Sequence, residues 1–515
     1  MVKRIILTLC IGLVLAGCQV SQQTGAQSRP SVFDIKTFGA VGDGKTLDTP
    51  SINKAIEAAS AAGGGTVFFP AGTYLCFSIR LKSNVALFLD HGATILAADP
   101  CEVAGGYDPA EPNPTDMYQD FGHSHWHDSL IWGEGIENVS ILGPGLIHGK
   151  GLVRMDSPKV GIGNKAIALK LCRNVIIRDI SILKGGHFAI LATGVDNLTV
   201  DNVKMDTNRD GINIDCCRNV RVSNLSVNSP WDDAICLKSS YGLGFARATE
   251  NVTITNCLVT GGYELGTLLD GTFKRFTPEF RVPRTGRIKF GTESNGGFKN
   301  ITISNIVFDY CQGLALETVD GGLLEDVTIT NITMRDIINM PIFLRLGSRM
   351  RGPEGTPVGQ LRRVNISNIV VYNSASRAAS TISGIPGHLI EGVRVSNVQI
   401  FLQGGGTKEQ AEIEPPEKEK DYPEPTMFGT LPAYGFFIRH VKGIEFSNVH
   451  ISYMKEDLRP AFVLDDVNEA DFNHIKAPHA PDVPVFVLKK VKDFNLHQCE
   501  GLADTQLKSV EQQKL

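Results

Sequence analysis

Short segments that alternate apolar and polar residues recur along most of this 515-residue chain. Each approximates Asn-Val-Thr-Ile-Thr-Asn and is rich in the Val, Ile and Thr that suit a pleated surface, so each predicts a half-buried β-strand. The ten copies begin at Asn138, Asn174, Asn197, Asn219, Asn251, Asn300, Asp326, Arg363, Gly392 and Gly443. Because a single strand of this kind is not stable alone, the copies must pack on one another.

The spacing of the copies indicates how they pack. Asn197 follows Asn174 by 23 residues, and Asn219 follows Asn197 by 22. This is too short for a strand, a helix and their connections, but it suits one turn of a coil built from short strands. We therefore predict an all-β parallel β-helix whose inward Val, Ile and Leu form a continuous core and whose recurrent Asn residues form hydrogen-bonded ladders. Longer gaps, such as the 49 residues from Asn251 to Asn300, predict loops that leave the stack and carry function.

The two ends of the repeat array are predicted to differ from its middle. Thr49 can cap a helix over residues 51–63, and we expect this helix, within an N-terminal cap of about residues 33–98, to cover the open end of the stack. Residues past about 450 keep a strand pattern but lose the repeat, as a terminal coil does. These features predict one domain over residues 33–503 and a frayed tail over residues 504–515.

The first residues resemble a bacterial lipoprotein signal. Lys3 and Arg4 precede an apolar run, and Leu15-Ala16-Gly17-Cys18 is a small-residue cleavage sequence. The interpretation is a signal peptide over residues 1–18, a lipid anchor on Cys18 and a flexible tether over 19–32, with an ordinary signal peptide as the alternative. Either predicts export, and the lipoprotein predicts a periplasmic or outer-membrane location. No later segment has the roughly 20 apolar residues of a membrane span.

Charge and cysteine usage exclude some classes of function. The formal net charge is −5 and lysine and arginine do not cluster, which gives no support to nucleic-acid binding. Apart from Cys10 and Cys18, nine cysteines lie in strand-like segments without metal-ligand spacing, so buried thiols are predicted rather than disulfides. We expect a monomer without a cofactor or a resident metal.

Three carboxylates stand out from the acids expected on solvated bends. Asp210 follows the copy at Asn197, and Asp232 and Asp233 follow the copy at Asn219. Consecutive coils should therefore place them on one face, about 4.8 Å apart along the axis. Mutual repulsion would raise the pKa of at least one of them and leave a protonated acid beside ionised bases, as glycoside hydrolysis requires. A calcium site is the competing use of such a cluster.

These residues resemble the motifs of glycoside hydrolase family 28, the polygalacturonase and rhamnogalacturonan hydrolase family. That family has an Asn-Thr-Asp motif and an Asp-Asp pair one coil later. Here the first reads Asn208-Arg209-Asp210 and the second Asp232-Asp233. The similarity covers about residues 33 to 450, and it implies a right-handed parallel β-helix that hydrolyses pectic polysaccharide.

The resemblance also implies roles for the acids. It makes Asp232 the general acid that protonates the leaving oxygen, with Asp210 and Asp233 activating a water for attack with inversion and Asn208 in the substrate site. Inverting enzymes typically have about 6.5 to 9.5 Å between acid and base, which is more than one strand spacing. We therefore expect a lateral offset between the two bends to supply the remaining distance.

The family's Gly-His-Gly motif is absent from this chain. The corresponding coil has the sequence GGYELG over residues 261–266, followed by an insertion up to Thr285, and Tyr263 is expected where the family has its histidine.

The family's Arg-Ile-Lys motif is displaced. Arg287-Ile288-Lys289 occurs before the repeat at Asn300, whereas the family's motif would follow that repeat, where the chain has Ala-Leu-Glu over residues 315–317. Either Arg287 and Lys289 reach the same subsite from a neighbouring coil, or the match is partly coincidental and the substrate differs from ordinary galacturonan. We favour the first, because a uronate substrate needs a cation for its carboxylate.

Further residues are candidates for sugar contacts. Lys238 should point toward the same face as the acids, and His187 precedes Asp210 by one coil, although a hydrogen-bonded bend histidine is an equal interpretation. Trp231, next to the acid pair, is either a sugar-stacking platform or buried at the bend.

Two irregular segments complete the pattern. Residues 99–128, which include His123, His125 and His127, predict a hydrogen-bonding loop beside the sugar site rather than a metal site. Residues 404–428 are charged and rich in proline, which predicts a mobile excursion.

Three hypotheses follow. The first is an exported hydrolase of α-linked galacturonic acid bonds, with long loops that favour removal of terminal residues. The second keeps the fold but predicts a calcium-dependent pectate lyase, in which Arg287 removes a proton. The third is a carbohydrate-binding or adhesive rod without catalysis.

Overall fold

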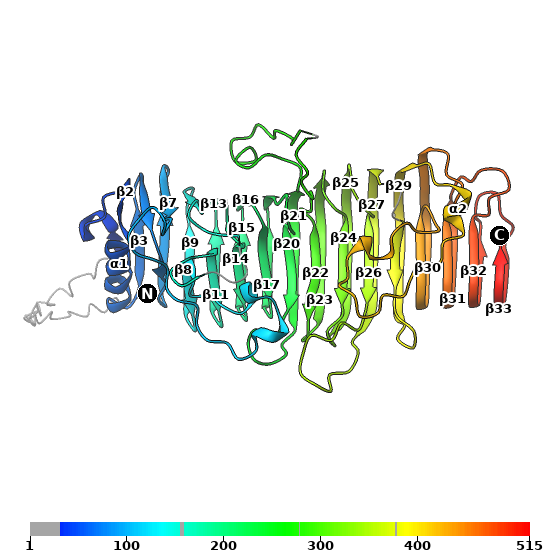
Figure 1. Ribbon diagram of the computed structural model, residues 1–515, viewed down its shortest axis with the longest axis horizontal. Coiled ribbons are helices and arrows are strands. Elements are labelled where there is room, and N and C mark those ends of the chain that lie inside the picture. The colour runs from blue at the N-terminus through cyan, green and yellow to red at the C-terminus, as the bar shows by residue number, and fades with distance from the viewer. Residues whose placement is uncertain (1–30, 155–158, 278, 376–378) are drawn as a thin grey trace, which may run out of the picture.

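The computed structural model describes residues 31–154, 159–277, 279–375 and 379–515. The predicted signal peptide, Cys18 and nearly all of the predicted tether lie outside these residues, so the lipid anchor stays a prediction. The chain is a right-handed parallel β-helix, as predicted, and its strands stack along one long axis from the N-terminal to the C-terminal end (Figure 1). In the described residues no helix is long and apolar enough to cross a membrane.

A typical coil contributes one strand to each of three parallel sheets. The sheet that carries the acids, here called the site sheet, contains β5 (Ile79–Arg80), β8 (Ser129–Glu134), β11 (Lys165–Lys170), β14 (Phe188–Thr193), β17 (Asp210–Asp215), β20 (Ile235–Ser239), β22 (Ile288–Ser294), β24 (Leu314–Thr318), β26 (Ile342–Leu346), β28 (Ser380–Ser383) and the start of β30 (Phe436–Lys455).

The other two sheets run beside it. The second sheet begins with β1 (Val32–Asp34), β3 (Gly65–Phe69), β6 (Val85–Leu89), β9 (Glu137–Leu142), β12 (Arg173–Arg178), β15 (Asp196–Asp201) and β18 (Arg218–Ser223). The third begins with β2 (Asp43–Leu47), β4 (Gly72–Cys76), β7 (Ala93–Ala97), β10 (Leu146–His148), β13 (Ser181–Leu183), β16 (Lys204–Asp206) and β19 (Ser226–Asn228).

From β21 onward the strands of the second and third sheets join. The joined strands are β21 (Thr249–Thr260), β23 (Phe298–Asp309), β25 (Leu323–Arg335), β27 (Gln360–Ser374) and β29 (Ile390–Gly404). In β30, β31 (Phe462–Lys476) and β32 (Phe486–His497) the whole coil is one long strand.

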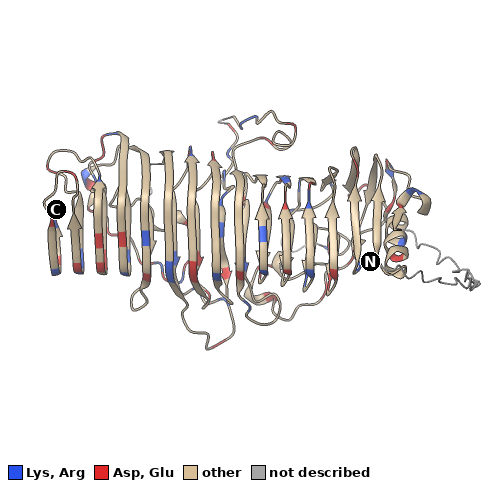
Figure 2. Ribbon diagram, turned by 180° about the vertical axis from the view of Figure 1, so that it is seen from behind, with Lys and Arg blue, Asp and Glu red and all other residues tan. Residues whose placement is uncertain are grey.

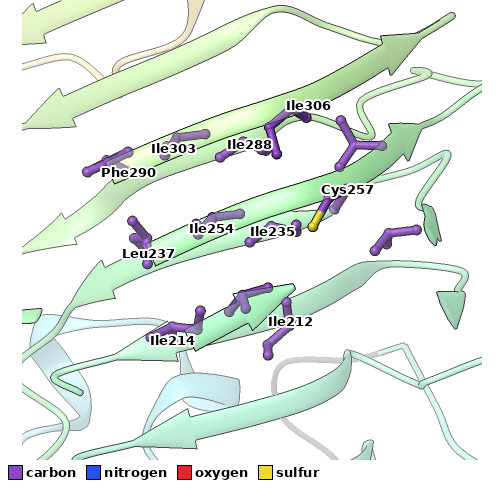
Figure 3. Close-up of a cluster of buried hydrophobic side chains, with 14 of the residues drawn as sticks. Ile212, Ile214, Ile235, Leu237, Ile254, Cys257, Ile288, Phe290, Ile303 and Ile306 are labelled. Atoms are coloured by element: carbon purple, nitrogen blue, oxygen red, sulfur yellow. The ribbon is translucent and has the colours of Figure 1, made fainter. Parts of the chain in front are cut away.

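Inward side chains of neighbouring coils form the core. Ile212, Ile235 and Ile288 occupy equivalent positions on β17, β20 and β22, and all three are fully buried (Figure 3). The nine cysteines of the described chain are free thiols, and all except Cys101 are buried, as predicted. Burial of stacked aliphatic side chains therefore holds the coils together.

The recurrent asparagines form the predicted ladders, at both ends of the repeat. The first Asn of the repeat adopts a left-handed conformation, and its side-chain amide donates to the Asn of the preceding coil, as in Asn174 to Asn138 at 2.9 Å and Asn300 to Asn251 at 2.8 Å. The last Asn does the same, as in Asn331 to Asn305 at 3.1 Å.

A ladder of alternating charge runs along the second sheet, a feature that the repeat did not predict. Neighbouring coils place acidic and basic residues in register over ten coils, and Figure 2 shows such residues at the same end of adjacent strands. The members are Glu137, Arg173, Asp196, Arg218, Glu250, Lys299, Glu325, Arg362, Glu391 and Lys442. Because opposite charges on adjacent strands favour each other, the ladder stabilises the correct register.

Helix α1 (Thr49–Ala61) covers the N-terminal end of the stack, as predicted, and buries Ile52 and Ile56. The predicted role of Thr49 is wrong. Its hydroxyl instead accepts from the Phe77 amide at 2.8 Å, and Asp48 is the residue that precedes the helix.

The predicted frayed tail is also wrong. Residues Thr505–Lys514 form β33, which pairs antiparallel with β32. This strand occupies the exposed edge of the last coil, an edge that would otherwise be open to pairing with another chain.

Candidate active site

Asp210, Asp232 and Asp233 lie together on the outer face of the site sheet, as the sequence predicted. Asp210 begins β17, and Asp233 lies two residues before β20; since Ile212 pairs with Ile235, the two acids occupy equivalent positions in adjacent coils. One oxygen from each carboxylate lies within 4.8 Å of one oxygen from each of the others. Asp210 and Asp233 are almost fully buried, and the side chain of Asp232 is 29% exposed.

The expected lateral offset between the bends is absent. The separation of the carboxylate oxygens is below the roughly 6.5 to 9.5 Å that is usual for inverting glycosidases. Backbone hydrogen bonds draw the bends together, because the Asp233 amide donates to Asp210 at 3.3 Å and to Asp232 at 3.0 Å.

The environment separates the pKa values of Asp210 and Asp232. Burial, reinforced by the negative charge of Asp232, raises the pKa of Asp210 well above its usual value. Burial also opposes ionisation of Asp232, but the Arg209 guanidinium at 3.1 Å and a hydrogen bond from Asp210 outweigh it and lower the pKa of Asp232. In the substrate-free protein the shared proton therefore resides on Asp210, whereas the family resemblance assigns the acid role to Asp232.

Arg209 is a functional residue that the sequence interpretation left without a role. Its guanidinium contacts Asp232, lies 4.0 Å from Asp210 and hydrogen-bonds the His187 imidazole. The signal was present, because arginine replaces the threonine of the family's Asn-Thr-Asp motif. His187 is thus joined to the acids through Arg209. Asn208 lies in the turn that precedes Asp210, and no hydrogen bond of the described residues joins its side-chain oxygen to the acids.

Arg287 and Lys289 reach the acids from the next coil, which supports the first account of the displaced motif. Arg287 donates to Asp233 at 2.8 Å, and the Lys289 ammonium lies 3.8 Å from Asp233. Both cations are buried and also face a glutamate from a distant segment, Glu424, at 2.9 and 3.7 Å. Nothing in the composition of residues 404–428 indicated that Glu424 belongs to the site.

Tyr263 and Lys238 have other partners. The Tyr263 hydroxyl donates to Asp309, and its ring packs against Phe273. The Lys238 ammonium lies in the same outer face as the acids but forms an ion pair with buried Glu293 at 2.7 Å. The place of Tyr263 at the position of the family's histidine therefore stays a prediction.

Trp231 lies at the rim of the site. It is only partly buried, its ring packs edge to face against Phe276, and the exposed Arg154 guanidinium lies 5.7 Å from its ring centre. Burial, together with the positive charge of Arg209, lowers the pKa of Arg154, and the negative charges of Asp232 and Asp210 oppose this shift. Trp231 is therefore available for stacking, and no motif had indicated Arg154.

The loop at 99–128 covers the site sheet on the N-terminal side of the acids. Trp126 packs on Ala168, Phe188 and Leu191, which point outward from β11 and β14. Its indole donates to Thr193 at 3.1 Å. This confirms a hydrogen-bonding loop beside the acids.

Residues 405–435, here called the arm, cover the C-terminal side. The prediction of a mobile excursion is wrong, because Phe428 and Leu431 pack on Phe343 and Phe437, which point outward from β26 and β30. Buried arginines hold the arm's backbone: Arg345 donates to the carbonyls of Glu417 and Lys418, and Arg439 donates to those of Pro415 and Pro416. Figure 1 shows the arm crossing the strands of this half of the sheet. The arm and the loop at 99–128 thus cover the site sheet on either side of the acids, where the Asp232 side chain stays 29% exposed.

The three acids form one of the clusters that could hold a metal ion. Their charge is already matched by Arg209, Arg287 and Lys289 in the described chain, at 3.1, 2.8 and 3.8 Å respectively. Added positive charge would face these cations, which disfavours the calcium interpretation.

Glu317 gives the site a pH-dependent effect on stability. It is fully buried with its carboxylate 3.5 Å from the Lys289 ammonium, and burial raises its pKa to about 8. Because the folded state holds this proton more tightly than the unfolded state, the stabilisation is complete below the unfolded pKa and is lost as the pH rises toward 8.

We therefore predict that the free energy of unfolding of wild type decreases between pH 5 and pH 8, and that this decrease is smaller in Glu317→Gln. The decreases in the two proteins should differ by about 2 kcal/mol or more, since one pKa unit corresponds to about 1.4 kcal/mol. Denaturant unfolding at the two pH values measures it, with Glu391→Gln on the second sheet as the matched control. Equal pH dependence in wild type and Glu317→Gln would contradict the assignment.

A buried acid beside other carboxylates on the outer face of one sheet suits glycoside hydrolysis, and the comparisons with known proteins support a glycosidase. A family model described as "Glycosyl hydrolases family 28" matches residues 116–267, which contain all three acids. A second, described as "Rhamnogalacturonase A/epimerase, pectate lyase-like", matches residues 32–116. This match supports the resemblance to glycosyl hydrolase family 28 that the motifs had indicated.

Individual relatives agree with this assignment. The chain is 25% identical over 422 residues to a probable polygalacturonase of Vitis vinifera, covering 77% of this chain and 80% of the relative. Its fold matches the family 28 exopolygalacturonase of Yersinia enterocolitica with a TM-score of 0.62 and 19% identity, over 88% of this chain and 79% of the other. It also matches a hyperthermoactive exopolygalacturonase of Thermotoga maritima with a TM-score of 0.58 and 17% identity, over 82% and 91% of the two chains.

Proposed function

We propose that this glycosidase removes terminal galacturonic acid residues from pectic polysaccharide or oligosaccharide by hydrolysis with inversion. The observation that carries the proposal is the cluster of Asp210, Asp232 and Asp233, with the cations Arg209 and Arg154 on the Asp232 side, where they suit an anionic substrate. Relatives named as polygalacturonases support galacturonan as the substrate class.

The covered site sheet supports action on chain ends. Long polysaccharide needs an open groove on both sides of the scissile bond, but here the loop at 99–128 and the arm cover the sheet on either side of the acids. The floor residues Lys238, Lys289 and Glu317 are each less than a tenth exposed, whereas about a third of the Asp232 side chain remains accessible. This geometry supports entry of a chain end at Asp232 rather than of the middle of a chain.

The reaction needs one proton and one water. A water molecule gives a proton to a carboxylate of the Asp210–Asp233 side while the water oxygen attacks the anomeric carbon. The bond between the anomeric carbon and the leaving oxygen breaks as Asp232 donates its proton to the leaving oxygen. Asp232 is ionised in the free protein because Arg209 pairs with it. A substrate carboxylate that binds Arg209 would weaken this pairing, raise the pKa of Asp232 and let it take the proton from Asp210.

Product analysis tests the proposal. Digests of galacturonan and short oligogalacturonides should release the monomer from the start, and proton NMR should detect the β-anomer first, because inversion of an α-linkage produces it. Early release of longer oligomers would contradict action on chain ends, and the α-anomer as the first product would contradict inversion. An unsaturated, ultraviolet-absorbing product would instead support β-elimination.

We also propose a cellular location and an oligomeric state for the enzyme. The lipoprotein signal over residues 1–18 supports an exported, membrane-anchored enzyme, and pectic substrates outside the cell are consistent with it. We propose that it acts as a monomer, since all three acids come from one chain.

A further inference from the structure

Glu424 of the arm occupies the place where the sequence predicted a substrate carboxylate. Arg287 donates to its carboxylate at 2.9 Å, and the Lys289 ammonium lies 3.7 Å from the same oxygen. Tyr422 of the same arm accepts from Lys289 at 3.4 Å, with its ring centre 5.2 Å from that ammonium. The two cations are therefore already bound by a carboxylate of the protein.

The charges beside Asp233 are balanced without a substrate. Arg287 and Lys289 supply two positive charges, and Asp233 and Glu424 supply two negative ones. Glu317, which also faces Lys289, is neutral below its pKa of about 8. A substrate carboxylate placed here would be a third negative charge in a buried region, and mutual repulsion would disfavour it.

The charges beside Asp232 are different. Arg209 and Arg154 lie on that side, where the side chain of Asp232 is partly exposed and Asp210 holds the shared proton. Two cations therefore face one ionised carboxylate. The excess positive charge favours a free uronate on this side, and an arginine can bind its carboxylate in a bidentate manner.

The fold fixes Glu424 in place. Glu424 immediately precedes the short helix η4 (Pro425–Phe428), whose Pro425 and Phe428 are buried against the site sheet. Upstream, the hydrogen bonds from Arg345 and Arg439 hold the arm's backbone. Its carboxylate is thus held by tertiary contacts on both sides, and the substrate need not position it.

We propose that Glu424 is a specificity-determining residue that binds Arg287 and Lys289 in place of a substrate carboxylate. The sugar unit beside Asp233 is then neutral or esterified, and the free uronate lies beside Asp232 and Arg209. The preferred substrate is a chain end in which a terminal galacturonate is linked to an uncharged unit. This inference rests on the proposed function and narrows its substrate class.

The variant Glu424→Gln tests the inference, because it removes one negative charge with almost no change of shape. Two disaccharides serve as probes: galacturonate linked to a free galacturonate, and galacturonate linked to its methyl ester. Wild type should prefer the ester by about tenfold or more in kcat/KM. Glu424→Gln should improve cleavage of the free acid about tenfold, mainly through a lower KM, and change cleavage of the ester less than threefold.

Two further variants separate charge from structure. Glu424→Asp keeps the charge and should keep the wild-type preference for the ester. Glu412→Gln changes an exposed acid of the same arm, 77% exposed and paired with Lys514 at 3.7 Å, and should leave both rates unchanged. Thermal unfolding of each variant checks that the arm remains in place.

The outcomes are distinguishable. A wild-type preference for the free acid, or an unchanged ratio of the two rates in Glu424→Gln, would overturn the role of Glu424 while leaving the glycosidase intact. Failure of wild type to release galacturonate from either probe, or from any longer pectic fragment, would overturn this inference together with the proposed function.

Discussion

Replacing Asp232 by Asn should lower kcat/KM on galacturonate-terminated substrates about 10³-fold. Asn cannot deliver a proton to the leaving oxygen, and loss of a general acid typically costs 10² to 10⁴. The fold should tolerate the change, because the Asn oxygen can still accept from the Asp233 amide, which lies 3.0 Å from Asp232. The same variant removes the charge that helps to raise the pKa of Asp210. The apparent pKa on the acidic side of the pH profile of any residual activity should therefore be lower than in wild type.

Reducing-sugar release at several substrate concentrations measures this effect. The matched control is Asp270→Asn in the insertion after β21, an exposed acid whose side chain accepts hydrogen bonds from the amide and hydroxyl of Thr272 in its own turn. A variant at Asp232 that retains activity within tenfold of wild type would show that another group protonates the leaving oxygen.

Replacing Arg287 by Met should destabilise the protein by about 3 to 5 kcal/mol, the usual cost of breaking a buried ion pair by removing one partner. Arg287 is 1% exposed and pairs with both Asp233 and Glu424, and the variant would leave Lys289 to face both acids without it. Their pKa values should rise, so the loss should be smaller at low pH than at neutral pH. Activity should also fall, since Asp233 loses the partner that positions it.

The midpoint of denaturant unfolding at pH 5 and pH 7 measures the change. Arg394→Met is the matched control, because Arg394 pairs with Glu445 at 3.0 Å but is 70% exposed, and exposed pairs contribute about 1 kcal/mol or less. If the two variants are equally stable, the buried pair does not have the structural importance assigned to it.

The repeat was sufficient to predict the fold and the meeting of the acids. Alternating residues at coil-length spacing have few packing solutions, and once the coils are in register, Asp210 and Asp233 fall at equivalent positions. The resemblance to family 28 then supplied a hypothesis for the chemistry, and the family model that matches residues 116–267 supports the resemblance. Local errors, such as the cap at Thr49 and the tail at 504–515, arose where a long-range contact overrides a local preference.

The arm shows most clearly where sequence reasoning failed. Its charge and proline content are typical of a mobile segment, but two buried arginines and an apolar patch on distant coils hold it. Arg345 lies 70 residues or more before the part of the arm that it binds, and no periodic pattern connects the two. Glu424 therefore reached the site through contacts that a local pattern cannot encode.

By itself, the sequence determined the β-helix, its ladders of asparagine and the three acids, because these depend on a period that repeats every coil. The tertiary structure alone decided which cations are already paired, which carboxylate holds the proton and how far the site is closed. Those properties depend on burial and on charges brought together from separate loops, and electrostatic energies in a low-dielectric site change with distances of a few ångströms.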